Sequence, residues 1–349
     1  MEGRPEETPE RLAFYDKIDK QNMTPLWSVL ADLVTPEPKS GCQAAFWHFD
    51  DIKTALLEAG GLITAREAER RVLILENPGL RGQSRITTSL YAGIQLVLPG
   101  EVAPAHRHTQ SALRFVLDGS GAHTAVNGER TLMHYGDFVI TPPMAWHDHG
   151  NESDAPMFWL DGLDIPLVSF LDASFAEMLG EDEQPIDRSP GQSYSEFGHN
   201  LVPVDSDRTT AKAVSPIFNY PYSYAREALD GMTRTRDPDP CHGHKMRYSN
   251  PLDGGHAMPT IGTFLQHVPK GFATARYRST DATTFVCVEG RGRTRIGEET
   301  FEWGPKDLFV APSWQPVSHE ADEDAVLFSY SDRPVQEKLG LWREDRGNA

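Results

Sequence analysis

The chain has 349 residues, 39% of them hydrophobic and 24% charged, and 33 Lys and Arg against 51 Asp and Glu give a net charge of −18. This length predicts roughly two domains, and the negative charge excludes partners held by charge alone, such as nucleic acid or an anionic membrane. The sequence contains no run of about 18 apolar residues that could cross a membrane, and the charged N-terminus does not resemble a secretory signal. Three widely separated cysteines do not suit a disulfide framework, so we expect a cytoplasmic protein.

The first 85 residues are expected to be helical. Residues 9–21 contain no glycine, and residues 50–59 form a short amphipathic stretch that ends at two glycines. Thr64 and Glu67 have the spacing of a capping box, in which each side chain accepts a hydrogen bond from the other residue's backbone N–H, so a helix should begin there and run through Arg71. We assign residues 1–85 to a helical N-terminal segment that packs on the rest of the chain.

Short apolar runs separated by Gly and Pro turns predict β-structure over residues 86–165 and again over residues 256–349. Asn127-Gly128 between two such runs is a strong hairpin signal. Residues 166–255 are polar and turn-rich, and we expect a long irregular linker with one or two helical turns at 223–229. The predicted fold is mainly β, with two small barrels or double-sheet rolls.

The two β regions are one pattern written twice. The run from Phe115 matches the run from Phe285 with one residue inserted, and Pro142 matches Pro312. The offset is 170 residues at both ends of the motif (285 − 115 and 312 − 142). A constant offset through a whole motif predicts a tandem duplication of one β domain.

Three histidines in the first β region predict a metal site. His106 and His108 are two residues apart, so on a strand their side chains point the same way. His147 follows the next strand and turn, where a barrel can bring it beside the pair. Imidazole is a common ligand of first-row metals, and three such ligands leave coordination positions open. The alternative is that these are ordinary core or surface histidines.

The second β region has lost these ligands. By the offset of 170, its corresponding residues are Arg276, Arg278 and Val317, while His319 corresponds to His149. We therefore expect one metal per chain, in the first region only.

The motifs resemble those of a known family. The patterns G-x5-H-x-H, from Gly100 to His108, and G-x5-P-x-M-x2-H-x3-N, from Gly136 to Asn151, are similar to the two cupin motifs. The sequence around them closely resembles the gentisate 1,2-dioxygenases and their salicylate and 1-hydroxy-2-naphthoate relatives. Many cupins carry a glutamate where this chain has Ala112 or Leu113, and its absence matches the three-histidine iron sites of the gentisate group.

This resemblance implies a bicupin, that is, two tandem double-stranded β-helix (jelly-roll) barrels. It implies an Fe(II)-dependent dioxygenase that uses O2 to cleave gentisate between the carboxyl-bearing and the adjacent hydroxyl-bearing carbon, giving maleylpyruvate. It also suggests a homotetramer. The open alternatives are salicylate, a substituted salicylate or 1-hydroxy-2-naphthoate as substrate, a non-catalytic binding or storage bicupin, and a metal-dependent sugar isomerase, which would usually need a carboxylate ligand.

Arg114 is the candidate that holds the substrate carboxylate. It lies inside an apolar strand, and a buried guanidinium needs an anion. Capture of the substrate carboxylate in a bidentate pair is one interpretation, and a salt bridge to Asp118 or Asp161 is the other. Gln95, on the preceding strand, could add an amide contact.

Two further polar residues are catalytic candidates. His149 should face the same cavity as His147 and could hydrogen-bond substrate or transfer a proton, or it could support the metal ligands from behind. Asp161 could meet the 5-hydroxyl of the ring, or pair with Arg114.

The remaining candidates shape or charge the pocket. Arg66 and Arg70 share a helix face, and the family places an N-terminal arginine pair at the active site, whereas a solvated face is the plain alternative. Tyr91 and Gly93 lie on the strand that enters the barrel and could shape the pocket around the ring. The Cys241–His244 tract falls in the linker without a further ligand, and we interpret it as a loop feature.

Overall fold

The computed structural model describes residues 7–204 and 214–347. It divides into two compact units, residues 1–39 and residues 40–349, which we describe separately. The first unit contains helices α1 (Pro9–Asp19) and α2 (Leu26–Leu33). The α1 helix begins after Thr8, whose hydroxyl accepts a hydrogen bond from the Arg11 N–H. Neither helix has a buried residue.

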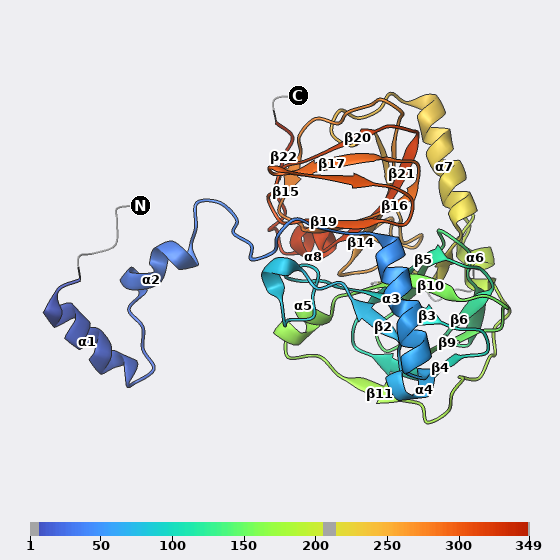
Figure 1. The fold of residues 1–349 in the computed structure, drawn as a ribbon, viewed down its shortest axis with the longest axis horizontal. Helices are drawn as coiled ribbons and strands as arrows, with labels where there is room; N and C mark the ends of the chain where they lie inside the picture. The colour runs from blue at the N-terminus through green and yellow to red at the C-terminus, as the bar shows by residue number, and fades with distance from the viewer. Residues whose placement is uncertain (1–6, 205–213, 348–349) are drawn as a thin grey trace. The chain divides into compact units, whose positions relative to one another are not determined.

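The second unit contains the sheets (Figure 1). Its strands are β1 (Ala45–Trp47), β2 (Val72–Ile74), β3 (Tyr91–Val97), β4 (Val102–His108), β5 (Ala112–Asp118), β6 (Ala122–Val126), β7 (Glu129–Leu132), β8 (Phe138–Thr141), β9 (His147–Asn151), β10 (Met157–Leu163), β11 (Ala176–Met178), β12 (Asn219–Tyr220), β13 (His244–Arg247), β14 (Gly262–Val268), β15 (Arg278–Ser279), β16 (Thr283–Glu289), β17 (Gly292–Ile296), β18 (Glu299–Trp303), β19 (Leu308–Ala311), β20 (Val317–Ala321), β21 (Ala325–Ser331) and β22 (Glu344–Asp345). Its helices are α3 (Phe49–Leu62), α4 (Ala65–Ala68), η1 (Pro78–Leu80), α5 (Ile165–Phe170), α6 (Gln192–Phe197), α7 (Tyr222–Thr235) and α8 (Arg333–Lys338).

Strands β3 to β10 form what we call the first barrel. One sheet has the order β12-β8-β5-β10-β3-β2 and the other the order β11-β4-β9-β6-β7, with every named pair antiparallel. Asn127 and Gly128 connect β6 to β7 with φ of 46° and 80°. Two successive positive φ angles are those of the tight hairpin turn that this dipeptide favours.

Strands β14 and β16 to β21 form the second barrel, in sheets of order β1-β19-β16-β21-β14-β13 and β18-β17-β20, and β15 pairs with β22 in a small separate sheet. The duplication is confirmed, because β6 and β9 begin at residues 122 and 147, and β17 and β20 begin 170 residues later, at 292 and 317. Two details differ from the sequence alignment. Tyr277 pairs with Val317 as His106 pairs with His147, so Tyr277 rather than Arg276 occupies the place of His106. Phe285 pairs with Phe309 as Arg114 pairs with Val139, so Phe285 occupies the place of Arg114 rather than that of Phe115.

The helical elements of the second unit partly follow expectation. The α3 helix buries Phe49, Ile52 and Leu56. The capping box between Thr64 and Glu67 is present, but α4 ends at Ala68 instead of continuing through Arg71, because Glu69 turns into a positive φ of 53°.

The connection between the barrels is more ordered than an irregular linker. It contains β11, α6, β12 and β13, and α7 extends over Tyr222–Thr235, well beyond one or two turns. The α7 helix buries Leu229 and packs against β13 and β14. Among the described residues, no helix is long and apolar enough to cross a membrane.

A shared core joins the two barrels. The rings of Phe115 and Phe328 stack with centroids 4.0 Å apart, and the Tyr330 hydroxyl donates a hydrogen bond to the Tyr91 carbonyl. Stacked aromatic pairs of this kind stabilise a core beyond the area they bury. The sheet of the first barrel that contains β5 therefore packs against the second barrel.

Candidate metal centre and substrate pocket

Three imidazoles converge inside the first barrel. His106 and His108 extend from β4 and His147 from β9, and the possible ligand atoms of the three lie within 4.8 Å of one another. The ring centroids of His106 and His147 are 4.1 Å apart, and those of His108 and His147 are 4.8 Å apart. Strand pairing brings them together, since His106 lies directly opposite His147.

Backbone carbonyl groups orient all three rings. The Nδ1 atoms of His106, His108 and His147 lie 3.2, 3.1 and 3.0 Å from the carbonyl oxygens of Pro104, Gln110 and Ala145, respectively. A carbonyl oxygen only accepts, so Nδ1 of His108 and of His147 carries the proton and their Nε2 atoms are left with a lone pair. Metal-ligating histidines have this arrangement, in which the second nitrogen is fixed by a hydrogen bond.

Burial keeps the three rings uncharged. It lowers the pKa of His106 to about 3 and that of His108 to about 4, with the guanidinium groups of Arg70 and Arg114 adding to the effect. Burial likewise places the pKa of His147 well below its ordinary value, and its Nε2 is a buried atom without a hydrogen-bond partner. An unpartnered lone pair in such a position fits a metal ion.

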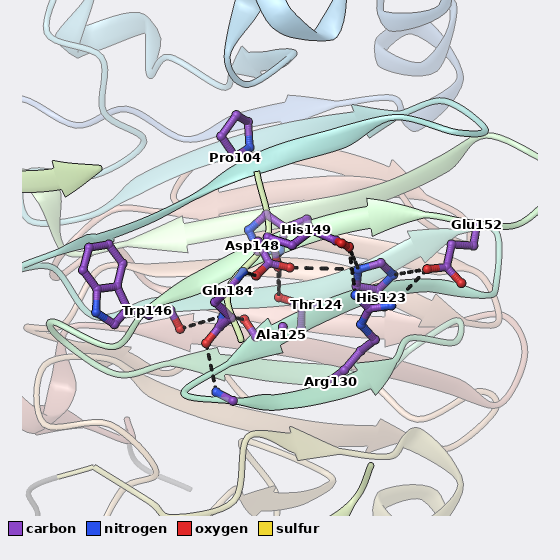
Figure 2. Close-up of polar contacts among 12 residues, drawn as sticks. Pro104, His123, Thr124, Ala125, Arg130, Trp146, Asp148, His149, Glu152 and Gln184 are labelled. Carbon is purple, nitrogen blue, oxygen red and sulfur yellow. Dashed lines mark hydrogen bonds and ion pairs between the residues drawn. The ribbon is translucent and has the colours of Figure 1, made fainter. Parts of the chain in front are cut away.

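The strand that carries His147 is anchored on its other face (Figure 2). Asp148 points away from the three histidines and accepts a hydrogen bond of 2.9 Å from the Gln184 backbone N–H. The Gln184 amide in turn donates to the carbonyl groups of Ala125 and Trp146. These contacts tie β9 to β6 and fix the position from which His147 extends.

Arg114 is fully buried beside Asp161. Its Nε lies 3.3 Å from a carboxylate oxygen of Asp161, and its Nη1 donates a 2.7 Å hydrogen bond to the Thr141 hydroxyl. The two charged residues are direct partners across β5 and β10. Asp118, the other partner considered for Arg114, instead pairs with Lys53 and Lys306.

Asp161 is a carboxyl group that burial makes hard to ionise. Burial raises its pKa to about 6, against the lowering effect of Arg114. The indole N–H of Trp159 donates a 3.2 Å hydrogen bond to its second oxygen. Sequence reasoning missed Trp159 and Thr141. For Trp159 the signal was its position two residues before Asp161, which puts both side chains on one strand face.

Three predicted residues share one face of β3. Gly93 lies opposite Asp161, and Gln95 lies opposite Trp159. Tyr91 is two residues before Gly93 and therefore lies on the same face of the strand. A Cβ atom on Gly93 would lie 2.5 Å from the Tyr91 hydroxyl oxygen, so only glycine leaves room for this tyrosine to fold across the strand. Burial and the nearby Asp161 raise the pKa of Tyr91 above its ordinary value, which keeps its hydroxyl protonated.

Arg70 reaches the site within its own chain. Its Nη2 donates a 2.8 Å hydrogen bond to the Pro104 carbonyl and lies against Nδ1 of His106. Arg70 can only donate, so its contact requires an unprotonated Nδ1 on His106, whereas the contact of Nδ1 with the Pro104 carbonyl requires a protonated one. Burial lowers the pKa of Arg70 to about 10, which still leaves it charged. The side chain of Arg66 lies outside the described part of the chain.

His149 is fully buried on the same face of β9 as His147, with the two ring centroids 5.6 Å apart. Its Nδ1 lies 2.7 Å from the Thr124 hydroxyl, and its Nε2 has no hydrogen-bond partner. The second barrel repeats this pair, with His319 Nδ1 2.8 Å from the Thr294 hydroxyl. The duplication therefore retained the threonine–histidine pair and replaced the three histidines.

A second group of possible ligands lies on the outer face of the first barrel. His123, Asp148 and Glu183 approach one another there, with His123 Nε2 3.9 Å from Glu183 and 4.0 Å from Asp148. Arg130 already supplies a counter-charge, since it contacts Glu183 at 2.8 Å and Glu152 at 3.0 Å. These contacts of His123 and Arg130 with acidic residues indicate an ion-pair network that holds β6, β7 and β9 together (Figure 2).

The Cys241–His244 tract is a turn that leads into β13, as expected of a loop feature. Cys241 and His244 are buried, and His244 begins β13 with its Nε2 3.0 Å from the Arg236 carbonyl. Within the described ranges, these residues are not part of any group of possible metal ligands.

The fold and the three convergent imidazoles define a metal-binding cupin protein. A model of the cupin domain matches residues 93–163. The chain is 62% identical over 343 residues, 98% of both chains, to gentisate 1,2 dioxygenase 1 of Aquipseudomonas alcaligenes. It is 37% identical over 308 residues, 86% of this chain and 78% of the other, to a 1-hydroxy-2-naphthoate 1,2-dioxygenase of Nocardioides sp..

A solved structure gives the same result. Salicylate 1,2-dioxygenase from Pseudoaminobacter salicylatoxidans, determined as an adduct with gentisate, superposes with a TM-score of 0.92 at 35% identity, covering 99% of this chain and 96% of that one. The protein belongs to the gentisate 1,2-dioxygenase family of ring-cleaving bicupin dioxygenases.

Proposed function

We propose that this protein is an Fe(II)-dependent gentisate 1,2-dioxygenase, which opens the ring between the carboxyl-bearing and the adjacent hydroxyl-bearing carbon to give maleylpyruvate. One observation carries the proposal. Three uncharged imidazoles converge beside a buried arginine in the first barrel, and Nε2 of His147 has no hydrogen-bond partner. The imidazoles provide a metal site with open coordination positions, and the arginine provides a partner for an anionic substrate.

The donor set suits ferrous iron and a 2-hydroxybenzoate. Three neutral ligands leave the full charge of a divalent metal, which a chelating carboxylate and phenolate would balance. We assign His106, His108 and His147 as the ligands. Fe(II), when bound there, supplies the redox chemistry that allows O2 to react with the ring.

Arg114 holds the substrate carboxylate in this proposal. The protein as a whole has a charge of −18 and offers an anion no general attraction, so a local guanidinium must provide it. Its Nη1 is already oriented by Thr141, which fixes the plane of the fork before substrate arrives. Arg70, which faces the same interior, adds a second positive charge, and Arg66 is the further candidate.

Asp161 accepts the proton of the ring's 5-hydroxyl. With a pKa of about 6 it is largely ionised near neutral pH and is still a competent base. His149 contributes its free Nε2 as a hydrogen-bond partner for the ring substituents, and Gln95 adds an amide contact. Tyr91 and Gly93 shape the wall against which the ring lies.

The alternatives can be ranked on the same residues. Salicylate, substituted salicylates and 1-hydroxy-2-naphthoate share the carboxylate and the adjacent hydroxyl, and they would use the same metal and Arg114. A 5-hydroxyl would donate to the one Asp161 oxygen that accepts no hydrogen bond in the structure, which favours gentisate. A storage bicupin would have no use for three convergent histidines in one barrel and their loss from the other.

The remaining assignments follow from this function. We propose that residues 86–165 are the catalytic cupin, that residues 256–349 are the metal-free cupin, and that the N-terminal segment 1–85 and the linker 166–255 support them. We also propose a cytoplasmic homotetramer. The exposed apolar side chains of α2, including Leu26 at 56% and Trp27 at 53%, are what an oligomer interface would bury.

Oxygen uptake tests the proposal directly. The purified protein is reconstituted anaerobically with Fe(II) and then mixed with O2 and gentisate, salicylate or 1-hydroxy-2-naphthoate in parallel. We expect the largest kcat/KM with gentisate, and maleylpyruvate as the product. Equal activity after reconstitution with zinc alone would refute an oxygenase, and a preference for the naphthoate would reassign the substrate. Light scattering of the same sample tests the tetramer.

A further inference from the structure

The second barrel contains a cavity that the proposed reaction does not use. It has a volume of about 600 Å³, and its lining includes Lys245, Gln266, Phe285 and His319. This barrel has lost all three histidine ligands, so loss of metal alone would be expected to leave a filled core. Instead, polar side chains project into an open space.

Lys245 lacks a counter-ion. Among the described residues no ion pair or hydrogen bond is made by its ammonium group, which lies 4.8 Å from the ring centre of Phe264 and 6.0 Å from that of Phe285. The charged groups that influence the pKa of Lys245 are Asp281, which raises it, and Arg333, which lowers it. Asp281 is already committed, since it accepts hydrogen bonds from Ser331 and Trp342. A half-buried ammonium held only by aromatic faces calls for an anion.

Two more polar groups face the same space. Gln266 is 1% exposed, and neither its amide nitrogen nor its amide oxygen has a partner. It lies directly opposite Lys245 across β13 and β14, which puts both side chains on one sheet face. His319 lines the cavity too, and its Nδ1 lies 2.8 Å from the Thr294 hydroxyl.

The duplication shows how this cavity was derived. Gln266 pairs with Lys245 as Gln95 pairs with Val72 in the first barrel, so a lysine replaces an apolar residue. Strand register also places Phe285 where the first barrel has Arg114. The two barrels therefore differ in where their cation lies relative to the equivalent glutamine. The first barrel has Arg114 on one side, whereas the second has Lys245 on the other side and the ring of Phe285 in the position of Arg114.

We infer that the second barrel binds a small organic carboxylate, with its charged end held by Lys245, Gln266 and His319 and its apolar body between Phe264 and Phe285. An ammonium and an amide N–H are two donors suited to the oxygens of one carboxylate, and the imidazole of His319 lines the same cavity. The aromatic walls favour an organic acid over an inorganic anion, whose hydration they could not replace. This site is separate from the metal centre and does not depend on which substrate the first barrel takes.

Calorimetry with benzoate tests the inference. The iron-loaded full-length protein is titrated with benzoate, and in parallel with sulfate, in wild type, Lys245→Met and Lys270→Met. Lys270 is an exposed lysine just after β14 and outside the cavity, so its replacement is matched in charge and size. We expect the number of benzoate molecules bound per chain to fall by one in Lys245→Met and to stay unchanged in Lys270→Met.

Two further variants keep the test decisive if Lys245→Met misfolds. Lys245→Arg should retain the benzoate site, and Gln266→Glu should remove it by placing a carboxylate beside the ammonium. Equal benzoate stoichiometry in wild type and Lys245→Met would overturn the inference. Sulfate binding as tight as that of benzoate would overturn the organic ligand. Turnover of gentisate, measured in the same samples, reports separately on the first barrel.

Discussion

Replacing Arg114 with lysine separates the two interpretations of this residue. The guanidinium reaches Asp161 with Nε and Thr141 with Nη1, which leaves the remaining face of the fork for a substrate carboxylate. Lysine keeps the charge but presents a single nitrogen, which can serve Asp161 or the substrate but not both in a planar pair. Loss of one charge-assisted contact costs about 2–3 kcal/mol. We therefore expect kcat/KM for gentisate to fall roughly 30- to 150-fold.

The matched control is Arg130→Lys. Arg130 belongs to the same barrel but pairs with Glu152 and Glu183 on its outer face, with 29% of its side chain exposed. This substitution should change kcat/KM by less than about twofold, because partly exposed ion pairs contribute little. Iron content should remain that of the wild type in both variants. If Arg114→Lys leaves kcat/KM within about twofold of wild type, the residue serves Asp161 alone and the substrate carboxylate is held elsewhere, with Arg70 the next candidate.

Three other outcomes are expected. His108→Ala should abolish turnover and iron binding while the melting temperature changes little, whereas two tightly held irons per wild-type chain would contradict the single site. Gly93→Ala should raise KM and cost about 1–3 kcal/mol of stability, since its Cβ would lie 2.5 Å from the Tyr91 hydroxyl oxygen, and adding Tyr91→Phe should recover part of that loss. Lys245→Met should raise the melting temperature near neutral pH, because burial lowers the pKa of Lys245 to about 8 and charging it costs stability. The wild type should recover this difference as the pH rises from about 8 toward the ordinary lysine pKa, and a gap that widened with pH would reverse the assignment.

Much of the fold could be predicted from the sequence, because its signals are local or repeated. The hairpin at Asn127 and Gly128, the capping box at Thr64 and the 170-residue repeat each follow from residue type and spacing. The one-residue difference that puts Phe285 in the place of Arg114 could not be predicted. It lies in the turn between β16 and β17, where glycines on either side allow both alignments.

The candidate site was predictable as far as strand alternation reaches. Alternation puts His106 with His108 and Tyr91 with Gly93 and Gln95, but it leaves Arg114 with two possible acidic partners. Only the pairing of β5 with β10 identifies Asp161 as the acidic partner of Arg114. Lys245 could not be recognised at all, since it follows a turn-rich segment and its strand is only four residues long. Its significance depends on a neighbouring strand that begins at residue 262.

The stacking of Phe115 on Phe328 has a consequence for how this chain can change. Each barrel covers apolar surface that the other would expose to water, and a Cβ atom on Gly162 of the first barrel would lie only 3.0 Å from the side chains of Leu113 and Tyr330. The second barrel therefore serves the first as a packing partner whatever it binds. Once the duplicated halves shared a core, the metal ligands of one copy could be lost at no structural cost, but the copy itself could not. Its interior therefore carries no metal-binding constraint, whereas the surface that packs on the first barrel is constrained by that packing.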